Sequence, residues 1–177
     1  MEALGSSLMT TRRILAALSA AGVAGLILLA SPAAHAAELE LTDPARDNEG
    51  PGLDIVDAGL ANNDYRLNVT LDYRVNRAGM TIVGLKARDR AGIRVIDKHQ
   101  ADGGGRTFLL SASNKVIRCG GLRADWDADD AELNVSIPST CLWSGNYGAV
   151  RPWFLTEPIG AGSDVDFLET KQWIARG

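Results

Sequence analysis

The chain contains few of the residues that enzymes use for catalysis. It has only 2 histidines, 2 cysteines and 3 methionines among 177 residues. It contains no Gly-x-Ser-x-Gly elbow, no His-Glu-x-x-His metal motif and no phosphate-binding glycine loop. Acid–base chemistry by histidine would depend on a single residue beyond the N-terminal segment. We therefore expect a protein that is not an enzyme.

The sequence also lacks a local run of lysine and arginine. Its formal net charge is −4 at pH 7, from 18 Lys and Arg residues and 22 Asp and Glu residues. Nucleic acids need a basic face for their phosphates, and anionic membranes attract basic segments. The composition therefore argues against both as partners.

Only one long apolar run occurs, Ile14–Ala30, directly after a pair of arginines. Pro32 ends the run, and Ala34-His35-Ala36 has the small-x-small pattern that a signal peptidase cleaves. We predict that residues 1–36 are a cleaved signal peptide and that the protein is secreted or extracytoplasmic. An uncleaved membrane anchor is the alternative, although the run is at the lower limit of what spans a bilayer.

Residues 37–177 are long enough for one domain with a hydrophobic core and carry no further membrane span. Loss of residues 1–36 would remove two arginines and one glutamate, which changes the net charge from −4 to −5. Cys119 and Cys141 both remain. An even number of cysteines in an exported chain predicts one disulfide, with two buried free thiols as the alternative.

Alternation of apolar and polar residues predicts β-strands. In Tyr65–Tyr73, every second residue from Leu67 onwards is apolar, which is typical of a half-buried antiparallel strand. Glu132–Pro138 repeats the pattern and ends at a proline, and a short helical turn is expected at Ser139–Cys141. Gly, Asn and Asp turns separate the segments, so we predict an all-β fold, a single antiparallel β-sandwich. The further predicted strands are 53–60, 80–86, 93–98, 107–110, 116–119, 122–126, 150–155 and 167–174.

An acidic segment opens the domain. Five oxygen-bearing side chains occur within about a dozen residues, between prolines and glycines, namely Glu49 and the four expected ligands Asp43, Asp47, Asn48 and Asp54. Calcium takes roughly six to eight oxygen ligands in a flexible geometry, so we predict a calcium site here. A solvated turn in which Asp accepts bonds from backbone amides is the alternative. A second acidic segment, Asp127–Asp130, is expected to be a hairpin turn.

The tryptophans predict a ligand surface and part of the core. Trp143, Asn146 and Tyr147 occur in a stretch with glycine and serine that is typical of an exposed loop. An exposed ring stacks on a pyranose and an amide adds hydrogen bonds, so we predict ligand-binding residues here. Core packing is the alternative for these rings, and we expect Trp153 and Trp173 to pack in the core.

The order of these segments resembles a known group of proteins. Asp43–Asn48 is followed by Leu53–Ile55 and an alternating strand, and Pro138–Leu142 precedes a closing Trp173–Gly177. This arrangement resembles small secreted bacterial β-sandwich proteins of unassigned function, which are similar to the superfamily of DOMON domains and family 9 carbohydrate-binding modules. The resemblance implies a module that binds sugar, haem or calcium.

Haem would need axial ligands, and the domain contains one methionine and one histidine, Met80 and His99. A single methionine on a strand is usually part of the core, so we do not expect haem. We predict an exported, non-catalytic binding module for a carbohydrate or a cell-envelope component, with calcium as a structural ion. The alternative is a structural or interaction β-sandwich that contacts an extracellular protein.

Overall fold

The computed structural model describes residues 37–44, 46–47, 52–159 and 166–177 of the chain. The predicted signal peptide, residues 1–36, lies outside this part. Within the described residues, no helix is long and apolar enough to cross a membrane.

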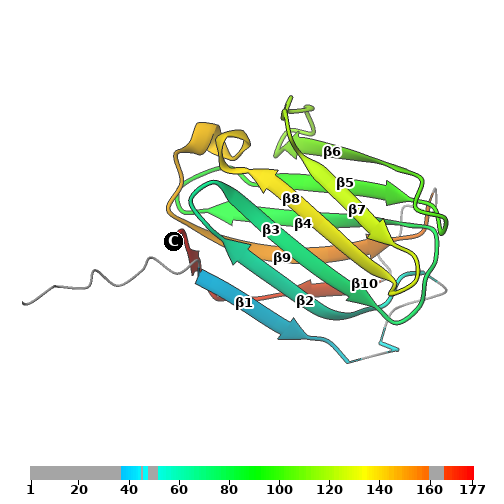
Figure 1. Ribbon diagram of the computed structural model, residues 1–177. Helices are drawn as coiled ribbons and strands as arrows, with labels where there is room; N and C mark the ends of the chain where they lie inside the picture. The colour runs from blue at the N-terminus through cyan, green and yellow to red at the C-terminus, as the bar shows by residue number, and fades with distance from the viewer. Residues whose placement is uncertain (1–36, 45, 48–51, 160–165) are drawn as a thin grey trace, which may run out of the picture. The chain divides into compact units, whose positions relative to one another are not determined.

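Two antiparallel sheets pack together as a sandwich (Figure 1). The first sheet contains, in spatial order, β1 (Ala37–Thr42), β2 (Ile55–Asn62), β3 (Arg66–Tyr73), β8 (Glu132–Pro138) and β7 (Arg123–Asp127). The second contains β10 (Asp166–Glu169), β9 (Ala149–Glu157), β4 (Gly79–Ala87), β5 (Ile93–His99) and β6 (Gly105–Ser111), with β11 (Ile174–Ala175) also paired to β9. The 3-10 turns η1 (Ser139–Cys141) and η2 (Trp143–Gly145) follow β8. The predicted β-sandwich and the predicted turn at Ser139 are confirmed.

Three segments differ from the strands that the sequence predicts. The segment predicted as one strand, 167–174, forms the two short strands β10 and β11, and residues 170–173 between them are in neither. β1 was not expected, and residues 116–119 form only a single bridge, Leu110 to Val116, instead of a strand. β1 alternates apolar and polar residues, with Ala37, Leu39 and Leu41 at every second position, and it pairs with β2, where Leu39 lies opposite Leu60. Residues 116–119 leave the sheet edge after that bridge, because Cys119 continues to its disulfide partner.

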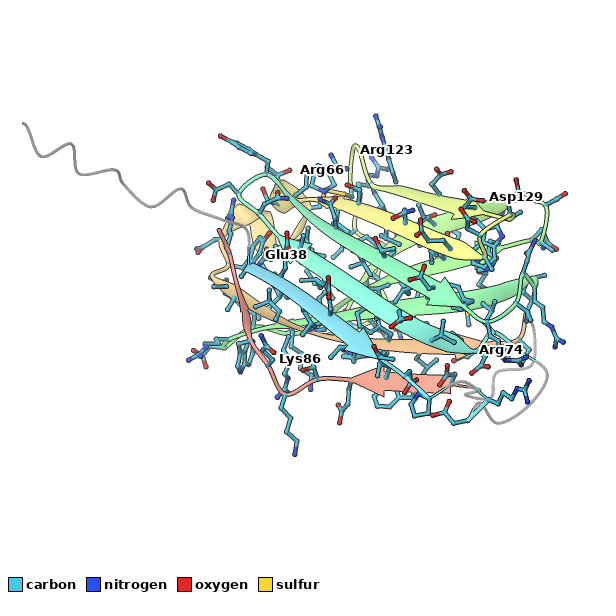
Figure 2. The ribbon with its side chains drawn as sticks, turned by 60° about the horizontal axis from the view of Figure 1, so that its bottom comes forward. Glu38, Arg66, Arg74, Lys86, Arg123 and Asp129 are labelled. Atoms are coloured by element: carbon cyan, nitrogen blue, oxygen red, sulfur yellow. A yellow bond between two sulfur atoms is a disulfide. The ribbon has the colours of Figure 1, made fainter. Side chains whose placement is uncertain are left out.

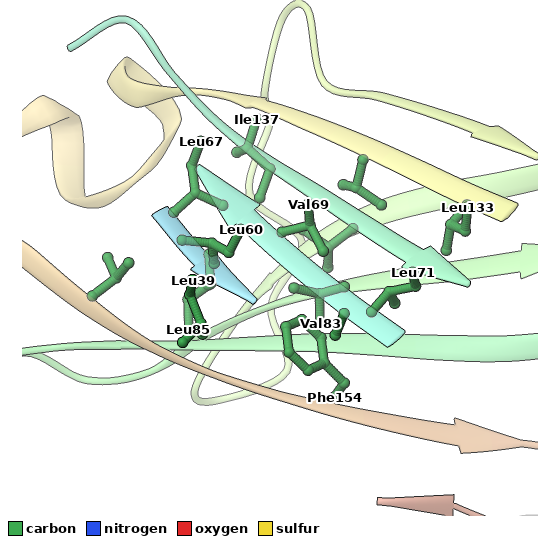
Figure 3. Close-up of a cluster of buried hydrophobic side chains, with 14 of the residues drawn as sticks. Leu39, Leu60, Leu67, Val69, Leu71, Val83, Leu85, Leu133, Ile137 and Phe154 are labelled. Carbon is green, nitrogen blue, oxygen red and sulfur yellow. The ribbon is translucent and has the colours of Figure 1, made fainter. Parts of the chain in front are cut away.

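The inner faces of the two sheets form the core (Figure 3). Four residues of β3 that were predicted to face inward are at most 4% exposed: Leu67, Val69, Leu71 and Tyr73. Val69 lies between Leu60 of β2 and Val135 of β8, so apolar rows run across the first sheet. Val83 and Phe154 of the second sheet are buried in the same cluster. Each fully buried side chain of this size contributes about 1.5–3 kcal/mol.

The outer face of the second sheet carries a separate apolar row. Four residues lie side by side on successive strands in the register: Leu155, Ile82, Ile96 and Phe108. Trp153 is next to this row and covers Gly84, where a Cβ would lie 1.8 Å from the indole. The prediction that Trp153 packs in the core is wrong, because its position on β9 faces outward and leaves it half-buried.

A disulfide joins Cys119 and Cys141, with their Cα atoms 5.4 Å apart. Cys119 lies in the segment that crosses from β6 in the second sheet to β7 in the first, and Cys141 ends η1. The predicted bridge is confirmed. It attaches the crossing segment to the turn that follows β8.

Replacement of both cysteines, Cys119→Ser with Cys141→Ser, is expected to lower the free energy of unfolding by about 3 kcal/mol. The bridge spans a sequence separation of 22 residues, and closing a loop of this length restricts the unfolded chain. Urea unfolding of the oxidised wild type and the double variant measures the difference. Reduction should destabilise only the wild type, and equal stability of all forms would contradict this role.

Candidate functional site

A buried segment before β2 connects the two sheets. Residues 53–55 are 0% exposed. The carbonyl oxygen of Leu53 accepts a hydrogen bond from Thr156 Oγ1 on β9 (3.0 Å), and Ile55 N donates to Asp166 Oδ2 on β10 (2.7 Å). The acidic opening segment is therefore held against the edge of the second sheet.

Three carboxylates meet at this edge: Asp43, Asp47 and Asp166, with one oxygen of each lying within 4.8 Å of the others. Asp43 follows β1, and its N–H donates to Val56 O (2.9 Å). Asp166 is the first residue of β10. Because β1 and β10 are edge strands on the same side of the sandwich, the cluster lies where the two sheets meet (Figure 1).

The environment of these carboxylates raises their pKa values. Burial raises the pKa of Asp43 to about 6, and the charges of Asp166, Asp47 and Asp54 act in the same direction. Burial also raises the pKa of Asp166, although the hydrogen bond from Ile55 N opposes this. Oδ2 of Asp43 is buried and has no hydrogen-bond partner among the described residues. A cation would stabilise a buried, unpaired carboxylate oxygen beside like charges.

The donor set suits a hard divalent cation. Calcium accepts carboxylate, carbonyl and water oxygens in a flexible geometry, and carboxylates bind it through one or two oxygens. The cluster contains no histidine or cysteine, the usual ligands of structural zinc. Asp43, Asp47 and Asp166 are therefore the residues that would hold calcium, with carbonyl groups and water completing its shell.

The other two predicted ligands have different positions. Both carboxylate oxygens of Asp54 accept the Arg46 N–H, at 3.2 and 3.0 Å, and Oδ2 also accepts a bond from Arg74 Nε. With its oxygens engaged, Asp54 shapes the loop and adds negative potential to the cluster. Asn48 lies outside the described residues.

Asp166 was not among the predicted ligands. It lies 111 residues from Ile55, its hydrogen-bond partner. The one sequence signal is its position directly before the predicted strand 167–174. The pairing of the two segments depends on how the sheets stack, and local sequence carries no information about that.

The Trp143 loop is built from three successive left-handed residues. Trp143, Ser144 and Gly145 have φ angles of 49°, 58° and 78°. The half-buried Trp143 donates from Nε1 to Ala91 O (2.8 Å). Its ring borders an apolar surface cavity of about 240 Å³, and Asn146 is exposed nearby in the chain. Two of the three predicted ligand-binding residues thus reach the surface.

Tyr147 is placed differently from the other two. It is 8% exposed, its hydroxyl donates to Asn62 Oδ1 (3.3 Å), and the Arg176 guanidinium lies 4.9 Å from its ring centroid. Burial raises the pKa of its hydroxyl. Tyr147 therefore supports the loop from inside and offers no free ring face to a ligand.

Met80 and His99 lie on opposite faces of the second sheet. His99 pairs with Gly79 in the register and is 1% exposed, whereas Met80 pairs with Lys98 on the outer face. His99 Nδ1 lies 3.0 Å from Asp97 Oδ2, and its ring stacks on Trp126 with centroids 3.8 Å apart. The two side chains cannot bind one haem from opposite faces, and His99 is closed to a substrate.

The second acidic segment forms the turn that the sequence predicts. Asp127 Oδ1 accepts the N–H groups of Asp129 and Asp130 at 2.9 and 3.3 Å. This is the Asp-capped turn chemistry expected between β7 and β8.

No protein-family model, curated protein or solved structure matches this chain. The resemblance to DOMON domains and family 9 carbohydrate-binding modules gains no support from these comparisons. The site is therefore interpreted from its geometry.

The metal-free protein is expected to lose stability through Asp43 as the pH rises from about 4 to about 6. The folded pKa of about 6 lies above the ordinary value of 3.8, so the folded state binds the proton more tightly than the unfolded state. This stabilisation is complete when the pH is below the ordinary pKa of 3.8, and it is lost as the pH rises through the pKa of the folded state, about 6. Thermal unfolding in EDTA across this range measures it. Asp43→Asn should flatten the decline, and an unchanged profile would contradict the assignment.

Proposed function

We propose that this protein is an exported, non-catalytic binding module with a structural calcium ion at Asp43, Asp47 and Asp166. Its ligand is a carbohydrate or another component of the cell envelope. The observation that carries the calcium assignment is the buried Asp43 oxygen, which has no hydrogen-bond partner in the described part of the chain and lies beside two more carboxylates. The disulfide supports export, because disulfides persist in oxidising compartments.

The calcium ion would join the edge strands of the two sheets. Asp43 belongs to the end of β1 and Asp166 to the start of β10, so one ion bridges both layers. Metal binding requires ionised carboxylates, and protons compete with it. Calcium binding should therefore strengthen as the pH rises through the pKa of Asp43, about 6.

The Trp143 loop is the proposed carbohydrate surface. The half-buried indole borders an apolar cavity, and the exposed Asn146 amide supplies donors and an acceptor. An apolar wall with a few polar groups is the usual composition of a small-molecule site. Tyr147 holds the loop in position from the core side.

A protein-interaction module is the second candidate, and one observation favours it. Trp126 and Tyr147 are each 8% exposed, so these two rings pack inside the protein and are not available to stack on a sugar. The apolar outer face of the second sheet, with Phe167 51% exposed, would then contact a partner protein. Binding to glycans separates the two candidates.

Calcium is expected to raise the melting temperature by about 5 °C or more over an EDTA-treated sample at neutral pH. A ligand at 100 times its dissociation constant adds about 2.7 kcal/mol to stability. Asp47→Asn should remove most of this rise, because Asp47 is exposed and its replacement removes a ligand without disturbing the core. Scanning calorimetry with and without calcium measures both effects.

Asp129→Asn is the matched control for this experiment. Asp129 is an exposed carboxylate in the β7–β8 turn, so the variant makes the same charge change away from the cluster (Figure 2). It should keep the full calcium response. If the wild type shows no rise, or if both variants lose it equally, the calcium site is rejected.

Trp143→Ala is expected to reduce affinity for an envelope glycan by about tenfold, since a central aromatic contact is often worth more than 1 kcal/mol. Asn146→Ala should give a smaller loss, because it removes hydrogen bonds and leaves the ring. Binding to immobilised glycans measures both, with the melting temperature as the check on folding. If the wild type binds no glycan, the carbohydrate assignment fails and the interaction module replaces it.

A further inference from the structure

A basic cleft lies on the second sheet, away from the acidic cluster. Four cations and an indole are among the side chains that line a surface cleft of about 480 Å³: Lys86, Arg88, Arg90, Arg151 and Trp173. Three of the cations alternate along the chain from β4 into the β4–β5 turn, and Arg151 lies opposite Lys86 in the β4–β9 register. Figure 2 shows Lys86 at one end of the sandwich and Arg74, which bonds Asp54, at the other.

These four cations have no carboxylate partner within 4.0 Å in the part of the chain that the structure describes. Asp89 is the acidic residue in the lining, at a φ of 55° in the turn. Lys86 and Arg151 face each other directly across two strands, and like charges in this arrangement destabilise a sheet. A chain with a net charge of −4 thus concentrates positive potential in one cleft.

Trp173 positions two of the guanidinium groups. Cζ of Arg88 lies 5.3 Å and Cζ of Arg151 5.4 Å from its ring centroid. The prediction that Trp173 packs in the core is wrong, because it is half-buried beside these arginines and lies outside the core cluster. A contact with the ring restricts a guanidinium and leaves N–H donors for an anion. Carboxylate, sulfate and phosphate groups match such donors.

We infer that this cleft binds the acidic group of an anionic polysaccharide. The guanidinium groups determine which class of anion binds. That this anion belongs to a polysaccharide is an inference that rests on the proposed function. Gly92 lines both this cleft and the cavity beside Trp143, so the two surfaces adjoin across the β4–β5 turn. A glycan that crosses the turn contacts the indole on one side and the cations on the other.

Dextran sulfate and unmodified dextran test this inference, because the two polymers share a backbone and differ in charge. The wild type should bind the sulfated polymer at least about tenfold more tightly at physiological ionic strength. Arg88→Gln with Arg151→Gln should lose at least about tenfold in affinity for dextran sulfate. Titration calorimetry measures the affinities, and the melting temperature confirms that each variant is folded. Equal binding of both polymers by the wild type would overturn the inference.

Lys98→Gln with Arg106→Gln is the matched control. These cations face each other on β5 and β6, on the outer face of the same sheet, so the charge change is identical. The control should retain most of the affinity. An equal loss of affinity in both double variants would overturn the inference, because dextran sulfate would then be attracted by the whole outer face of the second sheet and not by the cleft. Trp173→Leu keeps all four charges and should weaken binding several-fold, and unchanged affinity would overturn the positioning role of Trp173.

Inorganic sulfate and anionic phospholipid vesicles distinguish the possible carriers. Tight binding of free sulfate, or binding of vesicles in place of dextran sulfate, would overturn the inference that the bound anion belongs to a polysaccharide. A failure here leaves the calcium-dependent melting temperature and the effect of Trp143→Ala unchanged, so it is distinct from failure of the proposed function.

Discussion

The hydrogen bond from Ile55 N to Asp166 Oδ2 joins the two sheets at their edge, and the acidic cluster depends on it. It brings the start of β2 to the start of β10, and β1 follows because it pairs with β2 along its length. Asp43 and Asp166 therefore approach each other although their charges repel. A cation at this position would reduce the repulsion, so the proposed calcium ion would stabilise the sandwich at this edge.

Opposite charges gather at different places on the second sheet. Along β9, Thr156 bonds the buried segment beside the acidic cluster, while Arg151 faces the basic cleft near the start of the strand. A field of this kind directs an anionic ligand to the cleft and away from the carboxylates. The proposed ion site and the proposed anion cleft can therefore be altered independently. The net charge of −4 is an average that does not reveal this division.

Sequence reasoning succeeded where a feature depends on neighbouring residues. The alternation in β3 predicted that Leu67 and Val69 are buried, because side chains alternate across a strand. The turn at Asp127 followed from the tendency of Asp to accept bonds from the next amide groups. Sequence reasoning was incomplete for the acidic cluster, because it predicted Asp43 and Asp47 as members and did not predict Asp166. The expectation that basic residues do not gather locally was wrong, because Lys86, Arg88 and Arg90 alternate along the chain and line one cleft with Arg151 and Trp173.

The sequence by itself determined the strand periodicity and the turn chemistry, because period-two alternation and short-range hydrogen bonding act within a few residues. It also determined the cysteine pair, because the chain contains only two cysteines. Only the tertiary structure decided which aromatic residues are buried and which charged side chains meet. Tyr147 is buried and Trp173 is not, since the packing of distant segments sets their exposure. Asp166 joins Asp43 for the same reason. Contacts between edge strands depend on sheet order and register, which arise only when the whole core assembles.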